Sequence, residues 1–333
     1  MPNNGQTNIA RPGLPIRGKA SVLLALIASL GLASEAAFAS CRPKKPLPRV
    51  TATSMGPCAF DPDALSFRGD AAEQAACLMR PVDKLAKLGP PLAPLPNVFA
   101  TRVGRAVDFP DRETLSAYLS RRDLENDFAA YLWQPLSRAR DGHADAPAAK
   151  YLVIHDTSAP NFGGKPWPHD LDNDRGINRL ARHRCTDGWE SAHVFINRAG
   201  AMLLGHDFAV PWRATKFERA TRFGTDLKGL FLHVELVQPR RRDPRRGRSD
   251  DSVAPVPGFT ASQYERLALL YVIASVRSGH WLVPAFHAVI DRDTHGGHDD
   301  PQNFDTEAFA SSLDRLLREL PRRDPSMVFL DVL

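Results

Sequence analysis

Four residues of types that bind metals or move protons stand in three separate segments of the chain, in or after its apolar runs. His155 closes the run YLVIH, His287 opens the segment HAVIDRDTHGGHDDP, and Asp300 precedes Pro301. If the segments are strands or loops that meet, two imidazoles and one carboxylate can surround one zinc ion and leave a coordination position for water. Glu235, within the run LFLHVELV, could act as a general base. The set suggests a hydrolase.

The elements that must position these residues form an α/β domain, which we place at residues 146–333. The runs YLVIH, SAHVFINR and LFLHVELV have the β-branched, aromatic and aliphatic composition of strands. The segments SQYERLALLYVIASVRSG and TEAFASSLDRLLREL have helical periodicity. Thr260 or Ser262 can cap the first of these helices, and Gly279 can end it. We therefore expect a central mixed sheet flanked by helices.

Strand geometry selects Glu235 among the polar residues of this domain. Side chains alternate along a strand, so His233 and Glu235 share one face of LFLHVELV. A charged residue inside an apolar strand is costly unless it is paired, so Glu235 lies either at a water-facing edge or at a site. His155 and His193 also end or interrupt apolar strands, which favours the site.

The N-terminus has the pattern of an export signal over residues 1–39. A basic segment precedes the apolar run SVLLALIASLGLA, and the small-x-small sequence AFA precedes Ser40. A retained membrane anchor is disfavoured because the apolar run is shorter than a full span. We expect a periplasmic or secreted protein, with a lipid anchor at Cys41 of an outer-membrane lipoprotein as the less favoured alternative.

Residues 40–145 form an extension, mostly helical or irregular, in which we find no residues for chemistry. One helix is predicted over residues 111–132, with Asp111 as its N-cap.

Four cysteines follow the export signal. Export permits disulfides, and the short separation of Cys58 and Cys77 predicts that they are bridged. Two alternatives remain open for the other cysteines. Cys41 and Cys185 form a second bridge, or Cys41 is lipidated and Cys185 is free.

Composition is that of a folded globular chain, with 43% hydrophobic and 24% charged residues. The formal net charge of +5 is small for 333 residues and says little about partners. We find no nucleic-acid-binding signature and interpret the basic run from Arg240 to Arg248 as a solvated loop.

Together these motifs resemble those of the zinc-dependent N-acetylmuramoyl-L-alanine amidases of type 2, a family that includes peptidoglycan recognition proteins and T7-type lysozymes. The resemblance covers about residues 150–320. It implies that His155, His287 and Asp300 are the zinc ligands and that Glu235 is the catalytic glutamate. It also implies a type 2 amidase fold and a peptidoglycan or muropeptide substrate.

The chain departs from the family pattern at several positions. His298 stands where many members have lysine, and we expect it to stabilise the oxyanion as an imidazolium or as a suitably oriented neutral ring. The segment WRATKFE, residues 212–218, replaces a family segment that contains a histidine. Asp299 is the second choice for the third ligand, and the resemblance makes His193 a buried structural residue.

Two other functions compete with the amidase, namely a module that binds peptidoglycan without cutting it and a zinc hydrolase of another amide. The complete ligand set favours the amidase. The remaining histidines are assigned to the surface or to packing: His143, His169, His183, His206 and His280.

Overall fold

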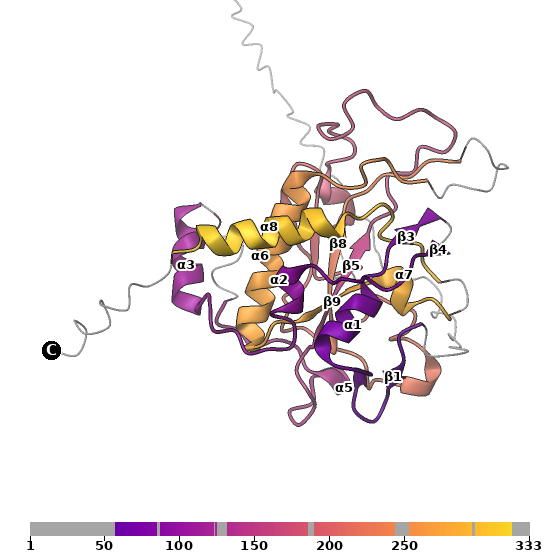
Figure 1. Cartoon of the computed structure of the whole chain (residues 1–333). Helices are drawn as coiled ribbons and strands as arrows, with labels where there is room; N and C mark the ends of the chain where they lie inside the picture. The colour runs from indigo at the N-terminus through magenta and orange to yellow at the C-terminus, as the bar shows by residue number, and fades with distance from the viewer. Residues whose placement is uncertain are drawn as a thin grey trace, which may run out of the picture. The chain divides into compact units, whose positions relative to one another are not determined.

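Five strands form the central sheet of the computed structural model, which describes residues 57–84, 87–122, 124, 132–185, 190–243, 253–294 and 297–321 (Figure 1). Their order is β7-β6-β8-β5-β9, and all neighbours are parallel except β6 and β7. The strands are β5 (Tyr151–Asp156), β6 (Val194–Ile196), β7 (Met202–Leu204), β8 (Phe231–Leu236) and β9 (Val283–Phe286). The three runs identified in the sequence are confirmed as β5, β6 and β8.

Two long helices pack against each other beside the sheet, α6 (Ala261–Ser278) and α8 (Thr306–Glu319) (Figure 1). Thr260 caps α6 through a capping box with Gln263, and Gly279 ends the helix in the left-handed conformation, with φ of 75°. Every residue of β5 is buried, as expected for a parallel strand whose two faces are covered. The expected α/β class, a mixed sheet flanked by helices, is confirmed.

The described part of residues 57–145 packs onto this domain. Phe67 lies edge-on to Tyr151 of β5 and Phe231 of β8, with ring centroids 5.2 and 6.5 Å away. Tyr151 precedes His155 by four residues, and Phe231 precedes Glu235 by four, so all four side chains lie on one face of the sheet. The N-terminal hairpin, formed by β1 and β2 and carrying Phe67, therefore covers the face of His155 and Glu235. The elements of this part are β1 (Phe60–Asp61), β2 (Ser66–Phe67), α1 (Ala71–Leu78), β3 (Val82–Asp83), β4 (Lys87–Leu88), α2 (Asn97–Ala100), α3 (Arg112–Arg121) and the short α5 (Ala139–Gly142).

Helix α3 begins as expected, because Asp111 accepts a hydrogen bond from the Thr114 amide at 2.7 Å. The helix ends at Arg121, and residues 125–131 of the longer predicted helix lie outside the described residues.

The predicted bridge between Cys58 and Cys77 is confirmed, with Cα atoms 5.9 Å apart. Cys185 is disulfide-bonded as well. The alternative of a free Cys185 is therefore wrong. Cys41, the partner in the alternative of a second bridge, lies outside the described residues, as do residues 1–39. Among the described helices, none combines the length and apolar character needed to span a bilayer.

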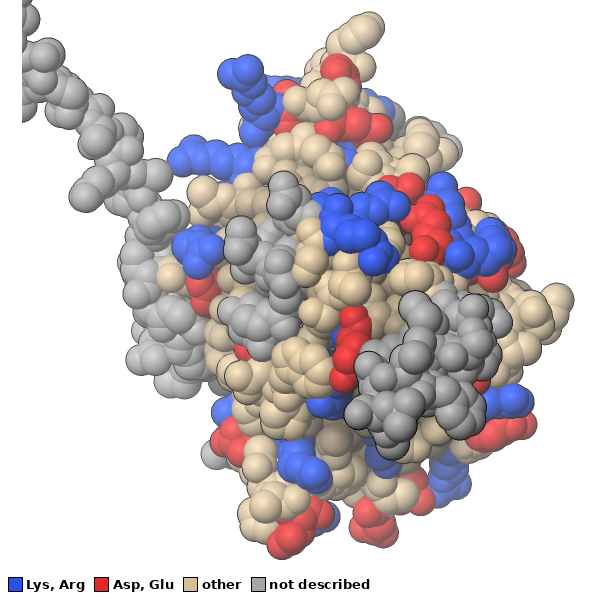
Figure 2. Space-filling view, turned by 90° about the vertical axis from the view of Figure 1, so that its left-hand side faces the viewer, with Lys and Arg blue, Asp and Glu red and all other residues tan. Residues whose placement is uncertain are grey.

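Acidic and basic side chains are interspersed on the molecular face seen in Figure 2, where blue and red residues lie close together on a largely tan surface.

Candidate metal centre

The parallel register of the sheet brings the first ligand and the candidate base together. His155 pairs with Glu235 across β5 and β8, near the carboxyl ends of both strands. Paired residues of parallel strands point to the same face, so both side chains lie over one side of the sheet. The carboxyl ends of strands are the usual place for a site in an open α/β sheet.

His287 and Asp300 reach the same place from the other side of β5. Strand β9 ends at Phe286, and His287 begins the short helix α7 (His287–Ile290). The Nδ1 atoms of His155 and His287 are 2.9 Å apart, and Asp300 Oδ2 lies 3.0 Å from His287 Nδ1 and 3.7 Å from His155 Nδ1. All three residues are buried. This cluster could bind a metal ion.

The electrostatics of the cluster differ between its two histidines. Burial lowers the pKa of His287, but Asp300 and Asp291 outweigh burial and raise it well above its usual value. Burial, and then the charge on His287, lowers the pKa of His155, so its ring is neutral as a metal ligand must be. Burial raises the pKa of Asp300, but His287 holds it below its usual value.

A second group, His287, Asp291 and His298, also brings ligand atoms together. The two groups share His287, and a neutral imidazole offers one lone pair. Its Nδ1 faces His155 and Asp300, whereas its Nε2 lies 2.9 Å from Asp291 Oδ2. Asp291 therefore accepts the Nε2 proton, as a carboxylate behind a metal-binding histidine does. We assign the metal site to the first group.

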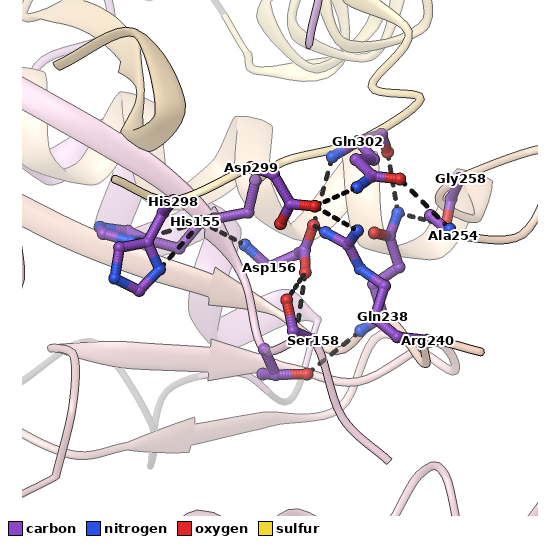
Figure 3. A network of polar contacts seen from close by, with 12 residues as sticks. His155, Asp156, Ser158, Gln238, Arg240, Ala254, Gly258, His298, Asp299 and Gln302 are labelled. Carbon is purple, nitrogen blue, oxygen red and sulfur yellow. Dashed lines mark hydrogen bonds and ion pairs between the residues drawn. The ribbon is translucent and has the colours of Figure 1, made fainter. Parts of the chain in front are cut away.

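Asp299, the second choice for the third ligand, is held elsewhere. Its Oδ2 accepts a hydrogen bond from Gln302 Nε2 at 2.6 Å and lies 3.5 Å from a guanidinium nitrogen of Arg240 (Figure 3). Its carboxylate belongs to neither group of ligand atoms among the described residues.

Glu235 has the environment of a residue that transfers protons. Its Oε2 is enclosed and has no hydrogen-bond partner among the described residues. Burial raises the pKa of Glu235 well above its usual value, and the negative charges of Asp300 and Asp156 add to the effect. A carboxyl group with a raised pKa can both accept and return a proton near neutral pH.

His298 lies at the exposed side of the cluster, with 43% of its side chain accessible. Its ring stacks on His287, with centroids 4.2 Å apart, and its Nδ1 is 3.6 Å from Asp300 Oδ1. Burial, and then the charge on His287, lowers the pKa of His298 to about 4. Of the two forms considered for His298, the neutral ring is therefore the one present at pH 7.

A buried ion pair lies directly behind the site (Figure 3). Asp156 Oδ2 accepts a hydrogen bond from Arg240 Nη2 at 2.6 Å and from the Gln302 amide at 3.2 Å. The Asp156 amide in turn donates to Asp300 Oδ2 at 3.2 Å. Burial raises the pKa of Asp156 to about 6, and Arg240 opposes that rise. The pair joins the end of β5 to the segment that follows β8, and Asp156 holds the loop that carries Asp300 through the Gln302 amide.

Our interpretation of the basic run as a solvated loop is wrong at Arg240 and Asp243. Arg240 is only 2% exposed and is paired with Asp156, because residues 237–239, between β8 and Arg240, are buried as well. Asp243 is 1% exposed and is paired with Lys84. Residues 244–248 of the run lie outside the described residues.

Three further residues behind the ligands were not selected from the sequence as site residues: His233, Glu218 and Asp291. His155 Nε2 lies 3.1 Å from His233 Nδ1, and His233 Nε2 lies 3.3 Å from Glu218 Oε2. The sequence does carry a signal for Glu218, because Thr215 and Glu218 have the spacing of a capping box. His193 is buried and contacts the carbonyl of Val210, in keeping with a structural role.

Comparisons of the chain with protein-family models, curated proteins and solved structures found no match in any of the three. The functional assignment therefore depends on the geometry of the site and on the sequence motifs.

Proposed function

We propose that the protein is a zinc-dependent amidase with a type 2 amidase fold. It would hydrolyse the amide bond between N-acetylmuramic acid and L-alanine in peptidoglycan or in released muropeptides. The observation that carries the proposal is the buried cluster of His155, His287 and Asp300, with Glu235 on the adjacent strand. The substrate is proposed from the resemblance of the sequence motifs to those of type 2 amidases.

The ligand set fits zinc. Two imidazoles and one carboxylate are ligands that catalytic zinc sites use, and a set of three leaves one position open. Zinc bound there would lower the pKa of a water molecule to about 7 and polarise the scissile carbonyl.

The side chains of this protein would handle the proton and the developing charge. Glu235, with its raised pKa, accepts a proton from the attacking water and passes it to the leaving amine. The accessible His298, as a neutral ring, donates a hydrogen bond to the oxygen that becomes negative.

We further propose that residues 1–39 direct export to the periplasm or the medium. The bridge between Cys58 and Cys77 supports export, because structural disulfides persist in oxidising compartments. A lipid anchor at Cys41 is the less favoured alternative, because it would leave Cys185 free, whereas Cys185 is disulfide-bonded.

Digestion of purified sacculi by the mature chain, followed by mass spectrometry, tests the proposal. We expect stem peptides with a free L-alanine amino group, together with glycan that retains intact muramic acid. The Glu235→Gln variant serves as the control and should release neither. Binding to sacculi without release would show a recognition module, and cleavage elsewhere in the peptide would show another amide hydrolase.

A further inference from the structure

We propose that the turn formed by residues 214–218 positions both histidine ligands, through Glu218 behind His155 and Asp291 behind His287. The inference depends on the metal site of the proposed function and assigns the residues that orient it.

The backbone amides of the turn are divided between two buried carboxylates. The amides of Ala214 and Thr215 and the Thr215 hydroxyl donate to Glu218 Oε2, at 3.2, 2.9 and 2.8 Å. The next two amides, of Lys216 and Phe217, donate to Asp291 Oδ2 and Oδ1 at 3.1 and 2.8 Å. Five donors thus hold both carboxylates in place, and both residues are fully buried.

The path from Glu218 to the metal ligand runs through His233. If Nδ1 of His155 binds the metal, the ring proton is on Nε2, which lies 3.1 Å from His233 Nδ1. His233 Nδ1 then accepts, so the His233 proton is on Nε2 and faces Glu218 Oε2 at 3.3 Å. His233 Nε2 is buried and makes no hydrogen bond among the described residues, and Glu218 Oε2 faces it at 3.3 Å. Glu218 therefore selects the tautomer that leaves Nδ1 of His155 free.

The second path is direct and uses a different ligand. Asp291 accepts the Nε2 proton of His287, which leaves Nδ1 of that ring for the metal. The third ligand, Asp300, is held by the Asp156 amide and, in the described part of the chain, makes no hydrogen bond or ion pair with the turn. The turn thus acts on two of the three ligands by independent routes.

Zinc affinity of the full mature chain, measured by competition with a chromophoric chelator, tests the inference without reference to activity. Glu218→Gln and Asp291→Asn should each weaken zinc binding about 10- to 100-fold, the usual effect of removing a partner behind a ligand. The absorption spectrum of bound Co²⁺ should also change in both variants. Glu190 is also a buried carboxylate, and it accepts a hydrogen bond from the Cys185 amide. Glu190→Gln is therefore the matched control and should bind both metals as the parent does.

Double substitutions separate positioning from general damage to the fold. Glu218→Gln should add little to His233→Gln, because both act on His155 through one path, whereas Glu218→Gln and Asp291→Asn should be additive. Metal-free unfolding of each variant monitors the fold. Thr215→Val, which removes the hydroxyl that donates to Glu218 Oε2 and accepts from the Glu218 amide, is the milder substitute if Glu218→Gln is unstable.

Parent-like zinc affinity and Co²⁺ spectra in folded Glu218 and Asp291 variants would overturn the inference. So would an equal loss in the Glu190 control. A parent chain that binds zinc with the expected variant pattern but leaves sacculi intact would reject the amidase proposal and retain the positioning turn.

Discussion

At the scale of single residues, the choice between Asp299 and Asp300 depends on which carboxylate faces the two histidines. Asp300 Oδ2 lies 3.0 Å from His287 Nδ1, whereas Asp299 faces Arg240 and Gln302. We expect Asp300→Ala to lose the bound zinc and Asp299→Ala to keep it, because only the first removes a ligand. Elemental analysis of the purified variants measures this. Full zinc in Asp300→Ala would show that another residue supplies the third ligand.

Glu235→Gln should retain zinc and lower turnover on muropeptides by a factor of about 10² to 10⁴, since it removes the proton acceptor and preserves the shape of the side chain. Steady-state kinetics beside metal analysis give both values. Near-normal turnover in a zinc-loaded variant would exclude Glu235 as the base.

His298→Ala should lower turnover without releasing zinc, because the ring is stacked at the accessible side of the cluster and is not among the three buried ligands. His298→Gln, which keeps a neutral donor, should recover part of the activity. If the Ala and Gln variants are both as active as the parent, the ring is only a loop residue.

At the scale of elements, the Asp156–Arg240 pair holds the end of β5 against the segment that follows β8. Arg240→Met should lower the free energy of unfolding by about 3 to 5 kcal/mol, because it leaves a buried carboxylate without its cation. Arg315→Met is the control, since Arg315 pairs with Glu265 at the surface and each side chain is about half exposed. Its cost should be about 1 kcal/mol or less. Equal costs for the two substitutions in urea unfolding would contradict the role of the buried pair.

At the scale of the whole molecule, the N-terminal hairpin and the site share one core. The ring centroid of Phe217 in the 214–218 turn is 5.3 Å from that of Phe60 and 6.2 Å from that of Phe67. Aromatic pairs at such distances add to the packing energy. The described part of the extension, whose sequence carries no chemistry, thus supports the turn behind the metal ligands.

Stability of the whole fold should depend on pH through His183, in the 3-10 turn η3 (Leu180–His183). Its ring stacks on Phe195, with centroids 4.9 Å apart, and burial lowers its pKa to about 4. The unfolded ring has a pKa of about 6.5, so between pH 6.5 and 4 the unfolded state binds a proton that the folded state does not. This contribution to stability is complete above pH 6.5 and is lost as the pH falls towards 4.

His183→Phe keeps the ring stacking and removes the titration. When the pH is lowered from 7.5 to 4.5, the parent should therefore lose more free energy of unfolding than the variant. Urea unfolding of both proteins at both pH values measures this difference. A difference between the two proteins that does not change with pH would contradict this.

Local patterns in the sequence were sufficient for much of the fold. The β-branched and aromatic runs identified β5, β6 and β8, and Thr260, Gly279 and Asp111 marked helix ends correctly, because capping and strand alternation depend on neighbours along the chain. The short separation of Cys58 and Cys77 along the chain was likewise sufficient to predict their disulfide.

The sequence also contained the residues of the metal cluster, since ligand types at strand ends are visible without a structure. It did not determine their partners. Whether Arg240 is solvated or buried, and which residues stand behind His155, depends on contacts between residues as many as 84 positions apart. Such contacts are created by the parallel register of the sheet and the packing of loops at its edge, which only the tertiary structure decides.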